Sequence, residues 1–311
     1  MTDVQRFATD LKQNIQKVIV GKNTVIDLII TSMLCSGHVL LEDIPGTGKT
    51  LLARSLAKSF DVEFNRIQFT PDLLPSDITG LNVFNQGVGK FEFRKGPLMS
   101  QIVLADEINR ATPRTQSSLL EAMAENQITV DGETYSLSEP FFVIATQNPI
   151  ESSGTFPLPE AQLDRFFMQL SMGYPTKDET VAILHRFEKV NPIDALQACV
   201  DVKSFKAIKD QVKQVRVSDA MTVYIIDLAE ATRDHSEIEL GVSPRGVMAL
   251  FNGAKALAAI NGRDYVTPED VKQLIVPIWG HRILIRDIYS KRPERILELI
   301  MAAVEVPTET I

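Results

Sequence analysis

The first 175 residues alternate between short apolar runs and segments of helical periodicity. Five runs have the length of β-strands: HVLLE (38–42), FNRIQF (64–69), IVLAD (102–106), FFVIATQN (141–148) and FFMQLSM (166–172). Most of these runs are apolar throughout, which is typical of a parallel sheet covered on both faces. Because helical segments such as 50–60 separate the runs, we predict an α/β fold with a doubly wound sheet.

Two segments interrupt the alternation of strands and helices. Residues 81–96 indicate two short strands around a glycine-containing turn, and residues 127–137 indicate a hairpin with Asp131-Gly132 as its two-residue turn. Pairing through that turn places Ile128 opposite Tyr135. Neither hairpin is needed to complete the sheet. Each is either a projecting interface element or an ordinary surface hairpin, and the pattern leaves both open.

Beyond residue 175 the strand pattern ends and helical patterns take over. Thr267-Pro268 with Asp270 marks the start of one of these helices. In the core, Thr112 is expected to cap a helix that begins at Pro113. We therefore predict an α/β core with two hairpin insertions over residues 1–175 and an all-helical lid domain over residues 176–311.

Composition makes several classes of protein less favoured. The chain has 311 residues, 44% of them hydrophobic, and a net charge of −8, so nucleic acid is not an expected partner. No apolar run is long enough to suggest insertion in a membrane. Cys35 and Cys199 are expected to be buried free thiols, which favours a cytoplasmic protein. The histidines lack ligand spacing and are expected to pack or to lie on the surface: His38, His185, His235 and His281.

A phosphate-binding loop follows the first predicted strand. The stretch DIPGTGKT (43–50) lies between that strand and a predicted helix, which is the setting that such a loop requires. Backbone N–H groups at the helix N-terminus then converge on phosphate oxygens. Lys49 is expected to reach the β- and γ-phosphates of ATP, and the Thr50 hydroxyl is expected to bind Mg²⁺. The expected nucleotide contacts are Pro45, Gly46, Thr47, Gly48, Lys49, Thr50 and Leu51.

One position departs from the usual pattern of this loop. The pattern GxxxxGK[ST] begins with glycine, and this chain has Asp43 there. Asp43 follows the strand directly, at the outermost position of the loop. Its side chain is free to turn from the phosphates, so we expect the loop to bind nucleotide.

Acidic and amide side chains end two further strands. Asp106-Glu107 follows IVLA, and Asn148 ends the next strand. Since the carboxyl ends of parallel strands form the ligand-binding edge of such sheets, these residues are expected beside the loop. Asp106 is expected to hold Mg²⁺, and Glu107 to orient and polarise the attacking water. Asn148 either holds that water or simply forms an Asn-Pro turn.

Taken together, these motifs resemble those of AAA+ ATPases of the MoxR group. The residues that carry the resemblance are DIPGTGKT, VLADEINRA with SSLLEAMAE, ATQNP, GTFPLPEAQLDRFF and SPRG. The resemblance extends over essentially the whole chain. It implies a P-loop core with a five-stranded parallel sheet, followed by a helical lid, in a homo-oligomeric ring that is expected to be a hexamer. The two hairpins resemble the helix-2 insert and the pre-sensor-1 hairpin of this branch.

The resemblance also implies roles for individual residues. Asn148 matches sensor 1, Arg165 in LDRF matches the arginine finger, and Arg245 in SPRG matches sensor 2. Val20 and Gly21 lie in a stretch that resembles the lining of the adenine pocket. The core motifs supply Lys49 but no obvious second cation, so we expect Arg165 to act on a neighbouring subunit. Independently, Arg245 lies in the first turn of a predicted helix, where a cation opposes the helix dipole and suggests a nearby anion.

The resemblance implies an ATP-hydrolysing, chaperone-like motor that remodels or matures a protein partner, such as a protein with a von Willebrand factor A domain. The sequence leaves two other functions open. One is a nucleic-acid-dependent motor, which the acidic charge disfavours. The other is a nucleotide-gated scaffold without useful turnover, which Glu107 disfavours.

Overall fold

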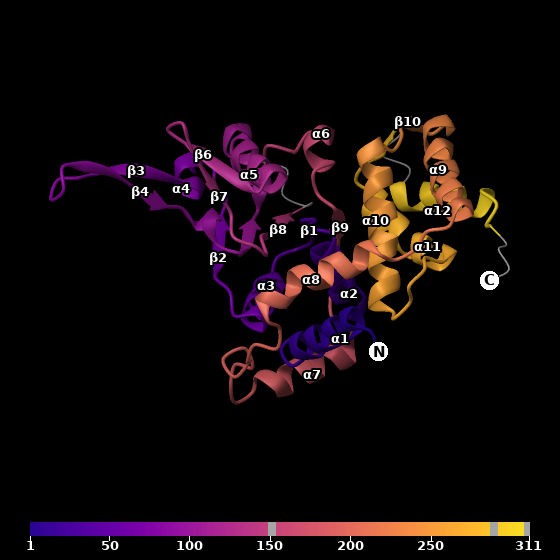
Figure 1. The fold of residues 1–311 in the computed structure, drawn as a ribbon, viewed down its shortest axis with the longest axis horizontal. Coiled ribbons are helices and arrows are strands. Elements are labelled where there is room, and N and C mark those ends of the chain that lie inside the picture. The colour runs from indigo at the N-terminus through magenta and orange to yellow at the C-terminus, as the bar shows by residue number, and fades with distance from the viewer. Residues whose placement is uncertain (149–153, 287–291, 308–311) are drawn as a thin grey trace.

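The computed structural model describes residues 1–148, 154–286 and 292–307 (Figure 1). The first part of the chain contains α1 (Asp3–Gln16), α2 (Asn23–Leu34), β1 (Val39–Glu42), α3 (Lys49–Phe60), β2 (Phe64–Gln68), α4 (Pro75–Thr79), β5 (Ile102–Asp106), α5 (Pro113–Glu125), β8 (Phe142–Gln147), α6 (Glu160–Leu163) and β9 (Met168–Leu170). The predicted helices and strands of the core are therefore present. Most of the strands are shorter than the apolar runs that predicted them.

The five core strands form one parallel sheet in the order β2-β5-β8-β1-β9. This arrangement confirms the predicted α/β fold with a five-stranded core. Strand β1 lies between β8 and β9, so the loop that follows β1 is flanked by the ends of neighbouring strands. The sheet order thus brings three separate sequence motifs to one edge.

Successive residues of the central strands point into two different hydrophobic cores. In β5, Ile102 and Leu104 belong to the core that contains α1, α2 and α3, whereas Val103 and Ala105 belong to the core that contains α5. Because side chains alternate along a strand, a sheet covered on both faces needs apolar residues at every position. This is the physical reason for the uniformly apolar runs in the sequence.

Both predicted hairpins are present and contact each other. The first comprises β3 (Gly80–Asn85) and β4 (Lys90–Lys95), and the second comprises β6 (Gln127–Val130) and β7 (Glu133–Ser136), with Ile128 opposite Tyr135 as predicted. Phe93 stacks on Tyr135 with ring centroids 4.0 Å apart. The β3–β4 hairpin extends away from the rest of the molecule (Figure 1). Its far end exposes Phe84 and Phe91 to solvent.

The second part of the chain is mainly helical. It contains α7 (Lys177–Phe187), α8 (Val202–Lys213), α9 (Asp219–Asp234), β10 (Ile238–Leu240), α10 (Pro244–Ile260), α11 (Pro268–Trp279), β11 (Leu284–Ile285) and α12 (Pro293–Ala303). The short antiparallel pair β10–β11 was not predicted, since two or three residues carry no strand pattern. A domain boundary at residue 175 stays a prediction.

Helix starts test the capping predictions. Thr267 and Asp270 form the predicted capping box at α11. Thr112 occupies the N-cap position of α5, but its side chain makes no capping hydrogen bond. Its hydroxyl lies instead 3.4 Å from that of Thr115. The predicted position of Thr112 as N-cap before Pro113 is therefore confirmed, but its side chain does not cap the helix.

The cysteines are unpaired thiols, as predicted, but they are not equally buried. Cys35 is partly buried, and Cys199 is exposed, so the prediction of burial is wrong for Cys199. Within the described ranges, no helix combines the length and the apolarity needed to cross a bilayer.

His38 and His281 lie inside the protein. The Nδ1 atom of His38 accepts the Val143 N–H at 3.0 Å, and its Nε2 atom lies 3.1 Å from the Met123 carbonyl oxygen, to which it donates. Burial lowers the pKa of His38 to about 4 and that of His281 to about 3. Each ring is therefore neutral in the folded protein, and His38 links β1 to the neighbouring strand β8.

Acid should destabilise the protein through His38. In the unfolded chain this histidine takes up a proton as the pH falls through about 6.5, whereas in the folded protein it stays neutral down to about pH 4. The neutral ring therefore contributes to the free energy of unfolding above pH 6.5, and this contribution is lost as the pH falls. The loss amounts to about 2 kcal/mol at pH 5.

Denaturant unfolding of wild type and His38→Asn between pH 5 and 7 checks this prediction. The variant should be less stable at pH 7 and lose less stability on acidification. The exposed His185→Asn control should follow the wild type; an unchanged pH dependence in His38→Asn would contradict the assignment.

Candidate functional site

A cavity of about 380 Å³ lies at the carboxyl ends of β1, β5 and β8, beside the start of α3. It is lined by Asp43, Pro45, Gly46, Gly48, Lys49, Thr50, Leu51, Arg66, Asp106, Glu107, Thr146, Gln147 and Asn148. The structure thus brings together most residues that the sequence analysis selected for nucleotide and magnesium binding. Pro149, which completes the predicted Asn-Pro turn, lies outside the described residues.

The loop between β1 and α3 depends on two glycines. Gly46 and Gly48 have φ angles of 85° and 93°, which side chains other than glycine rarely adopt. Gly48 is the N-cap residue of α3 and provides no side chain to accept from the first N–H groups of the helix. Those donors and the positive end of the helix dipole are suited to phosphate oxygens.

Lys49 is held over this loop by the loop's own backbone. Its Nζ donates to the carbonyl oxygens of Asp43 and Ile44, at 2.9 and 3.1 Å. Both acceptors are neutral, so the positive charge of Lys49 is not paired with a carboxylate in these contacts. This arrangement leaves the charge available to an anion in the cavity.

Asp43 has a structural role that explains its departure from the loop pattern. Its carboxylate accepts hydrogen bonds from the Ser171 hydroxyl (2.9 Å) and from the backbone N–H groups of Met172 (2.6 Å) and Gly173 (3.1 Å). The residue is 5% exposed. These contacts turn the carboxylate toward Ser171, as the sequence allowed, while Asp43 also lines the cavity. It joins the end of β1 to the segment that follows β9.

Asp106 and Thr50 provide oxygen ligands of the kind that Mg²⁺ prefers. Both line the cavity. The Oδ1 atom of Asp106 accepts from the Thr146 hydroxyl at 2.6 Å, which fixes the orientation of the carboxylate. These residues fit a magnesium ion bound together with nucleotide phosphates.

Glu107 lies next to Asp106 in a left-handed backbone conformation, with φ 56°. Such a conformation is unfavourable for glutamate and is retained where the surroundings impose it. Here the Glu107 N–H donates to the Thr146 hydroxyl at 2.9 Å. Its carboxylate accepts from Gln68 at 2.8 Å and from Arg110 at 3.1 Å. Glu107 is therefore held at the cavity by contacts with three residues.

Arg66 is a residue of the site that the sequence did not predict. This β2 residue lines the cavity, and its guanidinium donates to Asp106 Oδ2 at 3.0 and 2.5 Å. The core therefore supplies a second cation besides Lys49, contrary to our expectation. Arg66 and Gln68 were missed because β2 is an edge strand with several exposed positions. The polar residues that interrupt the apolar run FNRIQF were the feature of the sequence that could have indicated them. This run forms the strand that pairs with the Asp106 strand.

Five predicted site residues lie outside this cavity lining. Thr47 belongs to the loop itself. Val20 and Gly21 precede α2, and Gly21 has a φ of 67° and lies against the carboxylate end of Glu179 of α7. Arg245 is exposed in the first turn of α10, whose N-cap residue is Ser243. Arg165 is exposed between α6 and β9 and lines a separate cavity with Glu121 and Glu125.

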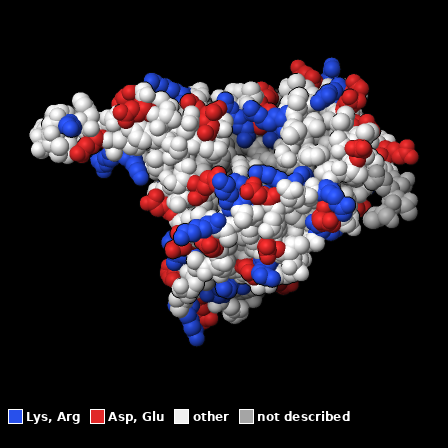
Figure 2. All heavy atoms as spheres, viewed as in Figure 1, with Lys and Arg blue, Asp and Glu red and all other residues white. Residues whose placement is uncertain are grey.

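Basic side chains gather around a hollow between the α6 side of the core and α10 (Figure 2). This concentration of positive charge contrasts with the net charge of −8 for the whole chain. A local positive field attracts anionic groups even in an acidic protein. The surface beside the core–lid junction is therefore suited to bind phosphate groups or the carboxylates of another protein surface.

A glycine-rich loop before a helix, a lysine at its end and an Asp-Glu pair on the neighbouring strand together define a P-loop nucleoside triphosphatase. Comparisons with known proteins narrow this class. The family model "ATPase family associated with various cellular activities (AAA)" matches residues 38–168, and the "AAA lid domain" model matches residues 230–300.

Relatives match nearly the whole chain. "Uncharacterized protein YeaC" of Bacillus subtilis is 48% identical over 300 residues, covering 96% of this chain and 94% of its own. "Chaperone MoxR1" of Mycobacterium tuberculosis is 36% identical over 305 residues, covering 94% and 80%. A crystal structure of a proposed ATPase from Cytophaga hutchinsonii has a TM-score of 0.91 at 39% identity, covering 98% and 96%. The chain belongs to the MoxR family of AAA+ ATPases, and it is an ATP-hydrolysing enzyme of the chaperone type.

Proposed function

We propose that this ATPase is a ring-forming motor that uses ATP and Mg²⁺ to remodel or mature a protein partner carrying a von Willebrand factor A domain. The observation that carries the proposal is the joint placement of Lys49, Asp106 and Glu107 around one cavity, in a protein with a projecting hairpin that exposes apolar side chains. Together they provide a site for hydrolysis and a surface for contact with a partner.

In the proposed reaction, the residues of the chain divide the work between binding and chemistry. Lys49 and the N–H groups of the loop bind the phosphates, and Thr50 and Asp106 hold Mg²⁺, which would neutralise charge on the phosphates. Glu107 orients the attacking water and polarises it as a general base. Asn148 contacts the same cavity and is the candidate for holding the water in line. Val20 and Gly21 remain the candidates for contact with the base.

The ring is proposed from the position of Arg165. This residue is exposed and lies outside the cavity that contains Lys49 and Glu107. An arginine placed there is suited to the γ-phosphate of a neighbouring subunit rather than to that of its own chain. We propose a homo-oligomeric ring, a hexamer, with Arg245 of the lid contacting nucleotide across the core–lid junction.

A protein partner is supported by the β3–β4 hairpin. Val88 and Phe91 are 61% and 71% exposed, and large exposed apolar side chains clustered on one element are typical of protein contacts. A relative named as a chaperone points the same way. We place this activity in the cytoplasm, where the unpaired thiols of Cys35 and Cys199 would stay reduced.

One observation favours a second candidate, a nucleic-acid-dependent motor. Strand β4 carries Lys90, Arg94 and Lys95 beside the exposed phenylalanines. Aromatic and basic side chains together bind single-stranded nucleic acid in other proteins. The net charge of −8 opposes this function, and the two candidates predict different stimulators of ATP hydrolysis.

The expected result is that a purified von Willebrand factor A domain protein from the same cell raises ATP turnover, whereas single- and double-stranded DNA leave it unchanged. The measurement is phosphate release at saturating ATP and Mg²⁺. Phe91→Ser, which removes the most exposed apolar side chain of the hairpin, should abolish the stimulation and keep basal turnover. Lys49→Ala should show no turnover under any condition. Stimulation by DNA alone would support the nucleic-acid motor, and failure of all such partners would overturn the proposal.

A further inference from the structure

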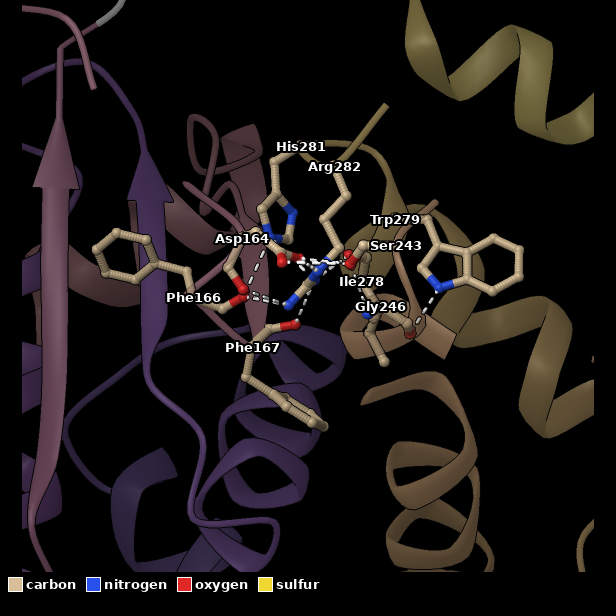
Figure 3. Close-up of polar contacts among 9 residues, drawn as sticks. All are labelled: Asp164, Phe166, Phe167, Ser243, Gly246, Ile278, Trp279, His281 and Arg282. Carbon is tan, nitrogen blue, oxygen red and sulfur yellow. Dashed lines mark hydrogen bonds and ion pairs between the residues drawn. The ribbon is translucent and has the colours of Figure 1, made fainter. Parts of the chain in front are cut away.

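A buried polar network joins the core to the lid (Figure 3). At its centre is Arg282, which follows α11 and is 7% exposed. Its Nε donates to Asp164 Oδ1 at 2.8 Å. Its other nitrogens donate to the carbonyl oxygens of Phe166 (2.6 Å), Phe167 (3.1 Å) and Ile278. One lid side chain thus binds a carboxylate and the backbone of the segment that leads into β9.

The cost of burying this guanidinium indicates that it specifies a particular geometry. Burial lowers the pKa of Arg282, and the Asp164 carboxylate opposes that change. A buried ion pair contributes little net stability compared with apolar side chains of similar volume. Its advantage is directional: the planar donor fork binds several acceptors only in one arrangement. Residues 164–167 are therefore held in a single position relative to α11.

Asp164 also binds the start of α10. Its two carboxylate oxygens lie 3.4 and 3.2 Å from the Ser243 hydroxyl, which donates to them. The same hydroxyl caps α10 by accepting the Gly246 N–H at 3.2 Å. Trp279 donates to the Gly246 carbonyl at 2.8 Å, so this helix start is fixed from α11 as well.

The two ends of this network adjoin the two arginines outside the cavity. Arg165 directly follows Asp164, and Arg245 lies two residues after Ser243. Arg245 is close enough that its charge also lowers the pKa of Arg282. Asp164 therefore lies next to Arg165, which is proposed to act on a neighbouring subunit. It also binds the start of α10, which carries Arg245, the residue proposed to contact nucleotide.

We infer that Asp164, Arg282 and Ser243 form a positioning unit that holds Arg165 in a fixed position relative to Arg245. This inference rests on the proposed function, in which Arg165 acts in trans. The position of the lid then determines where Arg165 is presented to the next subunit. Asp164 and Arg282 are positioning residues, since neither lines the nucleotide cavity among the described residues.

A second Arg–Asp pair in the lid provides a matched control. Arg263 donates to Asp270 at 2.7 and 2.5 Å, and Asp270 is 2% exposed. This pair joins the segment after α10 to the start of α11, and among the described residues its hydrogen bonds do not involve residues 164–167. Asp270→Asn therefore makes the same chemical change in a buried lid pair without touching the segment that carries Arg165.

The test separates positioning of Arg165 from general damage to the protein. Subunits with Glu107→Gln supply an intact Arg165 but hydrolyse ATP only slowly, and Arg165→Ala subunits supply an intact Glu107. Mixed rings of these two variants should regain hydrolysis at their shared interfaces. Adding Asp164→Asn to the Glu107→Gln subunit should reduce the regained rate at least about tenfold, because a misplaced cation stabilises the transition state poorly. Adding Asp270→Asn instead should leave the regained rate unchanged.

Ring assembly and ATP affinity are measured on every mixture by sizing and by titration with a fluorescent ATP analogue, and both should stay unchanged. Arg282→Lys in the Glu107→Gln subunit should reproduce the loss, because lysine lacks the planar fork; it replaces Asp164→Asn if that variant does not assemble. Full recovery with Asp164→Asn or Arg282→Lys would overturn the inference alone. No recovery in the parent mixture would instead overturn the action of Arg165 in trans, and with it this inference.

Discussion

Replacing Arg165 by alanine should slow ATP hydrolysis by about 10³–10⁵-fold and leave ATP affinity unchanged. The reason is that an arginine from a neighbouring subunit stabilises negative charge that develops on the transferring phosphoryl group. Arg165 is exposed and lines a cavity other than the one formed by the phosphate-binding loop. Because Arg165 does not line the nucleotide cavity of its own subunit, its loss should not affect ATP binding.

Two measurements separate action in trans from action in cis. Arg165→Ala mixed with Glu107→Gln should regain activity, because some interfaces combine an intact Arg165 with an intact Glu107. The specific activity of the wild type should also rise with protein concentration as rings assemble. Arg114→Ala, which removes an exposed arginine at the start of α5, serves as a control for loss of surface charge. A mixture as inactive as its components, in rings whose mixed composition is verified by capture through a tag on one variant, would contradict the assignment of Arg165.

Replacing Glu107 by glutamine should preserve ATP binding and slow hydrolysis by about 10²–10⁴-fold. Glutamine keeps the shape of the side chain and an oxygen that accepts from Gln68 and Arg110, but it lacks the charge that polarises water. The contacts that hold the side chain in place are thus conserved while its chemistry is removed.

Binding and chemistry are measured separately for this variant, by equilibrium titration with a fluorescent ATP analogue and by single-turnover phosphate release. Glu63→Gln makes the same change at an exposed position before β2 and should hydrolyse ATP at the wild-type rate. Wild-type turnover in Glu107→Gln would show that another group activates the water. Loss of ATP binding would show that Glu107 is needed to shape the site rather than to act as a base.

Local sequence patterns predicted the core elements of this protein well because each obeys a local physical rule. The strand IVLAD is apolar from Ile102 to Ala105 since alternate side chains enter two different cores, and its bounds 102–106 agree with β5. The loop DIPGTGKT requires glycine at two left-handed positions and a lysine at the helix start. Such constraints act over a few residues and can therefore be read from the sequence.

Contacts between distant segments escaped prediction because no local rule encodes them. Arg66 reaches Asp106 only because β2 pairs with β5 in the folded sheet. Cys199 resembles a core residue in its apolar surroundings, yet it is exposed where its segment crosses the surface. The pairing of β10 with β11 joins segments that are each too short to show a strand pattern.

The sequence by itself determined the nucleotide-binding loop, the Asp106-Glu107 pair and the order of core strands and helices, because short-range backbone geometry and burial impose them. Only the tertiary structure decided that Asp43 turns toward Ser171, that Arg66 joins the site, and that Arg282 binds Asp164. Each of these contacts joins residues that are far apart in the chain. Their geometry follows from how the sheet and the lid pack, which a local pattern does not contain.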